Sequence, residues 1–145
     1  MKVLIRSLRI QRRAVTAALY LKIWMSLCVV RVRLSVRGYQ AFEHAPVTVS
    51  KTKEEVSPPY IARIVERVSR YVPGALCLAQ AVTAQRLLAK MGFKTTMRVG
   101  VKSDDHDHLE AHAWLLYQGK VIMGGGGEDL GEFRVMTDMK SATRS

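Results

Sequence analysis

One uninterrupted run of helix-forming residues, from Ala75 to Gly92, constrains the fold of this chain more than any other segment. Pro73-Gly74 breaks the chain before it, and Gly92 stands where helices commonly end in a left-handed conformation. The apolar residues in the run follow the 3.6-residue period of a helix packed on a core: Leu76, Ala79, Val82, Ala84, Leu87, Leu88 and Met91. The pattern predicts a helix over 75–92 with Cys77 in its first turn.

The position of Cys77 suits a nucleophile, because the unpaired N–H groups and the positive dipole end of a helix start stabilise a thiolate. The same N–H groups can hold an oxyanion. The alternative is a purely structural cysteine, since free cysteine is among the most buried residue types. The segment Ala111-His-Ala-Trp114 has the pattern of a strand and supplies His112. A cysteine at a helix start and a histidine on a later strand are the two parts of a thiol-nucleophile site.

The other periodic segments predict helices first and strands afterwards. The expected elements are an amphipathic helix over 59–72, a strand over 95–101, a polar loop over 103–109, a strand over 111–117, a turn at 118–119 and a returning strand over 120–123. Helices followed by an antiparallel meander are typical of an α+β fold.

The first part of the chain, residues 1–58, reads as a basic helical arm with a connecting loop, and residues 59–145 as the core. The apolar run 14–30 predicts a helix that packs on this core, with Cys28 as a core residue; its inward positions are Leu19, Ile23, Leu27 and Val30. Lys22 interrupts the run and no cleavage site follows it, which argues against a membrane span or a signal peptide.

The net charge of +11 is unevenly distributed, since residues 1–40 contain no acid. A basic arm suits an anionic partner, and a solvated basic face is the equally simple alternative. The sequence contains no helix-turn-helix, zinc-finger or aromatic–basic RNA motif, so we do not expect nucleic-acid binding. Two cysteines do not make a disulfide framework, which favours a reducing cytoplasm. No P-loop is present, and no cofactor is expected.

Two segments together carry a resemblance to a known family: CLAQAVTAQRLLAKMGFKTTMRVGV and, after a loop, AHAWLLYQGKVIMGG. They resemble the transglutaminase-like protease domain of the B proteins of lasso-peptide biosynthesis. The resemblance covers roughly residues 60–135 and implies a papain- or transglutaminase-like fold. It implies a peptidase that removes the leader from a ribosomally made precursor. The implied partners are the leader peptide, a separate leader-recognition protein and a macrolactam-forming cyclase.

The resemblance assigns roles to individual residues. Cys77 matches the nucleophile and His112 the general base, and Trp114 packs beside them. The family expects an acid, usually Asp, on the next strand to orient the imidazole. With a turn at 118–119, His112 falls opposite Gly125, and neither Gly124 nor Gly125 carries a carboxylate. Glu128 and Asp129 are the nearest acids after the glycine run, and Asp129 is the favoured third member. The alternatives before the histidine are Asp104, Asp105, Asp107 and Glu110.

Three other functions stay open. The first is metal binding, because the spacings among His106, His108 and His112 are compatible with zinc or nickel. However, His112 lies in a strand pattern and no H-E-x-x-H motif is present, so no metal is expected. Transglutaminase-like sites also transfer acyl groups to amines. Some relatives are inactive peptide-binding modules, and the missing carboxylate is compatible with such a catalytically impaired scaffold.

Overall fold

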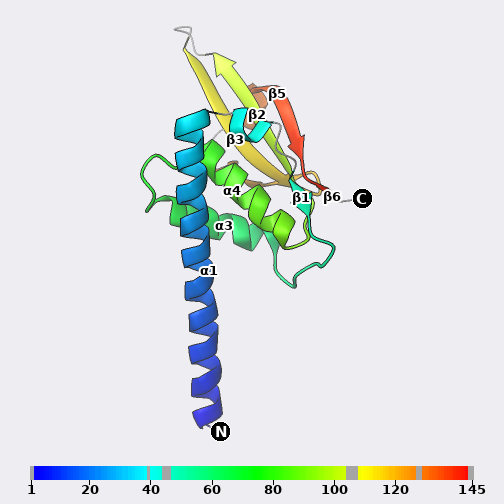
Figure 1. Ribbon diagram of the computed structural model, residues 1–145. Coiled ribbons are helices and arrows are strands. Elements are labelled where there is room, and N and C mark those ends of the chain that lie inside the picture. Colours follow the sequence, from blue (N-terminus) through cyan, green and yellow to red (C-terminus); the bar gives the residue numbers. More distant parts are fainter. Residues whose placement is uncertain (1, 39, 44–46, 104–107, 127–128, 144–145) are drawn as a thin grey trace.

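The computed structural model describes residues 2–38, 40–43, 47–103, 108–126 and 129–143, and Figure 1 shows their arrangement. The helices are α1 (Lys2–Arg37), α2 (Gln40–Glu43), α3 (Pro58–Ser69) and α4 (Cys77–Lys90), and a short 3₁₀ helix, η1 (Leu130–Glu132), follows later. The strands are β1 (Thr48–Val49), β2 (Thr96–Ser103), β3 (Leu109–Tyr117), β4 (Lys120–Met123), β5 (Arg134–Lys140) and β6 (Ala142–Thr143). Helices followed by an antiparallel sheet confirm the predicted α+β fold.

The main sheet has the strand order β4-β3-β2-β5, and all its neighbouring strands are antiparallel. The predicted hairpin is confirmed, since Tyr117 pairs with Lys120 across Gln118 and Gly119, which both have positive φ angles. A second, smaller sheet pairs β1 with β6 in parallel. This pairing brings the segment before α3 next to the end of the chain (Figure 1).

The helices pack on one face of the main sheet and form a single core with it. The predicted inward face of α3 is confirmed, since Ile61, Ile64, Val65 and Val68 on it, and Val72 after it, are all buried. In α4 the predicted apolar face is also buried except for Leu76, which lies before the helix begins and is 73% exposed. Gly92 ends this segment with φ +87°, as the sequence predicts.

The helix α1 is much longer than the predicted segment 14–30, and its N-terminal turns project beyond the other elements (Figure 1). Ile23, Leu27 and Val30 are buried against α3 and α4, and Cys28 packs partly against the same core. The predicted packing of this helix is therefore confirmed. No helix in the described ranges combines the length and the apolarity needed for a membrane span.

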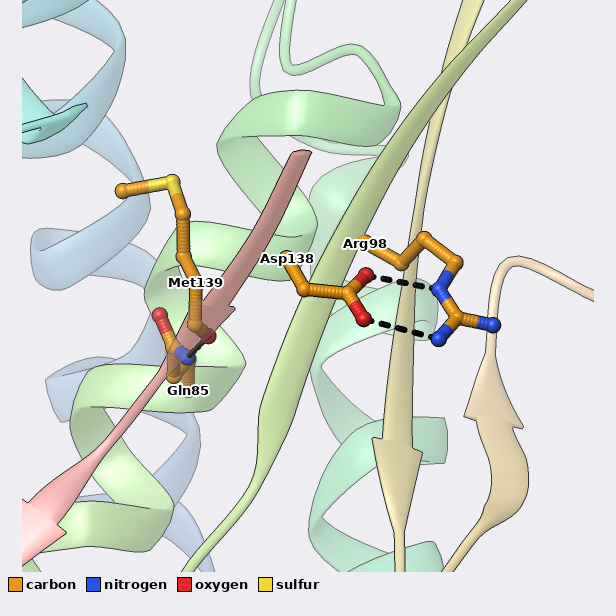
Figure 2. Close-up of polar contacts among 4 residues, drawn as sticks. All are labelled: Gln85, Arg98, Asp138 and Met139. Atoms are coloured by element: carbon orange, nitrogen blue, oxygen red, sulfur yellow. Dashed lines mark hydrogen bonds and ion pairs between the residues drawn. The ribbon is translucent and has the colours of Figure 1, made fainter. Parts of the chain in front are cut away.

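Two segments contain structure that the sequence pattern does not predict. The connecting loop expected before residue 59 contains α2 and β1, and the last part of the chain, for which the sequence pattern predicts no element, contains β5, an edge strand that pairs with β2. Figure 2 shows the contacts that hold β5: Gln85 Nε2 donates to the Met139 carbonyl at 2.6 Å, and Arg98 donates to both carboxylate oxygens of Asp138 at 2.6 and 2.8 Å. Backbone pairing and these side-chain bonds, which composition does not reveal, make this charged segment a strand.

The Arg98–Asp138 pair predicts a pH-dependent stability. The hydrogen bonds from Arg98 lower the pKa of Asp138, so the folded pKa lies below the unfolded one. The stabilisation is therefore present above the unfolded pKa, about 4, and is lost as the pH falls through the folded pKa. Because both side chains are about one third exposed, the effect should be below about 1 kcal/mol. Urea unfolding should show Asp138→Asn to be destabilising at pH 7 and nearly neutral near pH 2; an equal loss at both pH values would contradict this.

Candidate active site

The helix α4 begins at Cys77, which confirms the predicted first-turn position of this cysteine. Leu76 precedes it in an extended conformation and its side chain makes no capping hydrogen bond, so the first-turn N–H groups have no side-chain cap. The first turn contains no acid, so no carboxylate there neutralises the positive end of the helix dipole. Lys90 lies in the last turn, at the negative end of the dipole. Cys77 is half-buried and packs against the edge of the core.

His112 lies on β3, half-buried among aromatic rings. Its ring stacks on Trp114 with centroids 6.0 Å apart and lies 5.5 Å from the ring of Phe133. Trp114 is 3% exposed, which confirms its predicted packing role. Ala113 belongs to the core shared with the helices, so strand alternation places His112 and Trp114 on the other face of the sheet.

The imidazole of His112 is held by a backbone carbonyl. Its Nε2 lies 2.7 Å from the Gly124 carbonyl oxygen. A carbonyl only accepts hydrogen bonds, so Nε2 carries the proton, and the lone pair of the neutral ring is on Nδ1. That tautomer is the one a general base needs if Nδ1 is to take the thiol proton.

Gly124 is itself fixed by a carboxylate from the helical layer. Its N–H donates to Glu66 Oε1 of α3 at 3.2 Å, and its φ is +78°. A Cβ at this position would come within 2.8 Å of the Ala113 carbonyl oxygen and 2.9 Å of the Trp114 Cβ. Only glycine therefore fits this conformation without displacing the carbonyl that contacts His112.

The register of β4 differs from the predicted one. Tyr117 pairs with Lys120 as expected, but an irregularity between Leu115 and Leu116 places Met123 opposite Leu115. β4 then ends at Met123, so Gly125 does not pair with His112 and the prediction of that pairing is wrong. The physical reason is the bulge, which adds one residue to β4 and turns Gly124 toward the histidine.

Asp129 is not brought to His112 by any contact in the described part of the chain. It is the N-cap of η1, where its Oδ1 accepts a hydrogen bond from the Gly131 N–H at 2.9 Å. Asp104, Asp105 and Asp107 lie outside the described residues, and Glu110 is exposed and pairs with Lys102 at 3.2 Å. Glu66 is the acidic residue near this histidine that the sequence did not single out. It lies on the polar face of the 59–72 helix, and nothing in the pattern predicts its contact with the Gly124 N–H.

Cys77 and His112 belong to two elements that pack together, α4 and β3. The ring of Phe93, just after α4, meets the ring of Tyr117, the last residue of β3, edge to face at 5.9 Å. His112 lies on the face of β3 that is turned away from the helical core, so the strand alternation does not direct its side chain toward α4. No hydrogen bond between the Cys77 sulfur and the His112 ring occurs among the described residues, so the catalytic pair stays a prediction.

The described residues contain no group of three or more potential metal ligands. His106, which the metal alternative needs, lies outside the described ranges, and His108 is exposed. The absence of a cofactor therefore stays a prediction from the sequence.

Comparison with known proteins agrees with the fold. Residues 24–138 match the model of the transglutaminase-like superfamily, a match that includes α3, α4 and the strands β2 to β4. Searches of curated proteins and of solved structures found no significant match. Because the matched segment spans most of the chain and contains both Cys77 and His112, the chain belongs to the transglutaminase-like superfamily.

Proposed function

We propose that this protein is a cysteine peptidase that removes the leader from a ribosomally synthesised precursor during lasso-peptide maturation. The observation that carries the proposal is Cys77 as the first residue of α4 in a chain of the transglutaminase-like superfamily. Cysteine proteases and acyl transferases of this superfamily use a thiol nucleophile, and the AHAW segment adds the resemblance to the lasso-peptide B proteins. The substrate would be the precursor leader, presented by a separate leader-recognition protein in the cytoplasm. A macrolactam-forming cyclase would take the product.

The proposed reaction proceeds in two halves. His112 Nδ1 accepts the thiol proton, the Cys77 sulfur bonds to the scissile carbonyl carbon, and the first-turn N–H groups of α4 hold the oxyanion. The tetrahedral intermediate collapses to a thioester as the C–N bond breaks, and the Nδ1 proton goes to the leaving amine. Water then attacks the thioester carbonyl carbon with its proton passing to Nδ1, the C–S bond breaks to release the carboxylic acid, and Nδ1 returns the proton to the Cys77 thiolate. Throughout the reaction, the Gly124 carbonyl accepts the hydrogen bond from the Nε2–H group and thereby orients the ring.

An amine in place of water in the second half would make the protein an acyl transferase with the same residues. A catalytically impaired peptide-binding scaffold is the other alternative. The sequence favours it, because Gly124 and Gly125 carry no carboxylate and the favoured acid, Asp129, caps η1.

The experiment that tests the nucleophile compares two cysteines within one molecule. Cys28 and Cys77 are both half-buried, so burial alone does not separate their rates of alkylation. Iodoacetamide labelling followed by mass spectrometry should modify Cys77 at least about tenfold faster than Cys28 below pH 7, because only Cys77 lies at a helix start. His112→Ala should remove that advantage. Equal rates for the two cysteines, unchanged in His112→Ala, would refute the proposed catalytic pair.

A further inference from the structure

A cationic groove lies between α1 and α4, on the contact between these two helices. Its volume is about 290 Å³. Its apolar wall includes Met25 and Val29, which are 55% and 51% exposed although they stand beside the buried core. Its basic wall is formed by three side chains, Arg33 of α1 and Arg86 and Lys90 of α4.

The three cations have no counter-ion in the described part of the chain. The ion pairs there involve other residues: Arg98 with Asp138, and Lys102 with Glu110 and Glu132. Arg86 lies over the ring of Phe42, 4.7 Å from its centroid, and is partly desolvated. Burial, and then the charge of Arg33, lower the pKa of Arg86. Arg33 and Lys90 are exposed, and the charge of Arg33 beside half-buried Arg86 raises the free energy of the protein, which an anion bound there would lower.

A buried hydroxyl on the groove provides a second, independent observation. Thr83 of α4 lines the groove and is 1% exposed, and its Oγ1 has no hydrogen-bond partner. An unpaired buried hydroxyl is unfavourable, and a ligand that accepts from it or donates to it would remove that cost. Arg86 and Lys90 also line a neighbouring hollow of about 260 Å³ next to Val47 and Thr48 of the β1 segment. The basic surface therefore continues from the groove toward β1.

We propose that this groove binds an extended or helical peptide segment in which carboxylate side chains alternate with apolar ones. The carboxylates would pair with Arg33, Arg86 and Lys90, and the apolar side chains would cover Met25 and Val29. Free anions would not use the apolar wall, and an uncharged apolar segment would leave the cations unpaired. The mixed character of the groove therefore selects a peptide that is both acidic and apolar. This site is distinct from Cys77 and does not depend on the proposed peptidase activity.

The test uses the full chain and a labelled synthetic peptide in which glutamate alternates with leucine. Fluorescence anisotropy at physiological ionic strength should show saturable binding. The double variant Arg33→Gln, Lys90→Gln should weaken it about tenfold or more. The control is Arg63→Gln, Arg70→Gln, which removes the same charge from exposed positions of α3 and its C-cap and should change affinity less than about twofold. Arg86 is left intact because it packs on Phe42.

Further measurements decide the chemistry of the ligand. A matched peptide with glutamine for glutamate should lose most of the binding, and Thr83→Val should weaken it at unchanged melting temperature. Equal losses in the two double variants would overturn the proposal, because they would indicate general electrostatic attraction. It would also be overturned if phosphatidylserine vesicles or a single-stranded oligonucleotide bound as tightly as the peptide with the same dependence on Arg33 and Lys90. A dimer of this chain that the same variants dissociate would identify a second copy as the occupant instead.

Discussion

Replacing Cys77 by alanine should abolish precursor cleavage, with a loss on the order of 10⁴-fold or more, because no thioester can form without the sulfur. Cys77 is only half-buried at the edge of the core, and alanine is an excellent helix former, so the variant should keep its fold. Cleavage is measured by mass spectrometry of the precursor in the presence of the separate leader-recognition protein. Peptide binding should be unchanged, which separates loss of chemistry from loss of substrate.

The matched control is Cys28→Ala, which removes the other free thiol from the middle of α1 and should leave cleavage within a few-fold of wild type. Retained cleavage in Cys77→Ala would exclude the thiol mechanism. If wild-type protein binds the precursor but neither hydrolyses it nor transfers its acyl group to an added amine, the peptide-binding scaffold becomes the better description. Product formed only with an added amine would instead identify an acyl transferase.

Replacing Gly124 by alanine should impair the same reaction by about 10²-fold, through the position of His112. The φ of +78° would cost roughly 1–2 kcal/mol for a residue with a Cβ. That Cβ would also press on the Ala113 carbonyl and on Trp114, so the 124–125 peptide must shift. The shift removes the acceptor of the Nε2–H bond, and the imidazole loses its preferred tautomer and orientation.

The control for this variant is Gly126→Ala, since a Cβ there meets no described residue within 4 Å and the φ of Gly126 lies outside the positive range. It should keep wild-type cleavage and the wild-type pH profile of Cys77 alkylation. Glu66→Ala should reproduce part of the Gly124→Ala defect, because it removes the acceptor of the Gly124 N–H, and Glu66→Gln should restore it. A normal alkylation profile in both Gly124→Ala and Glu66→Ala would show that this contact does not position the histidine.

The parts of the protein that depend on local periodicity could be predicted from the amino-acid sequence. The apolar repeat and the terminal glycine predict α4 with Cys77 in its first turn, and the structure begins the helix at that residue. The buried face of α3, the packing of α1 along Ile23, Leu27 and Val30, and the β3–β4 turn were also predictable. In each case the residues that decide the structure are neighbours along the chain.

The surroundings of His112 depend on tertiary contacts that the sequence does not reveal. Its Nε2 partner is a backbone carbonyl that a bulge in β4 brings into place, and the carboxylate that fixes this carbonyl comes from Glu66 on α3. The strand β5 and the groove with Arg33 and Arg86 likewise join segments far apart in the chain. Backbone acceptors have no sequence signature, and contacts between distant segments depend on register and helix packing, so local pattern alone could not reveal them.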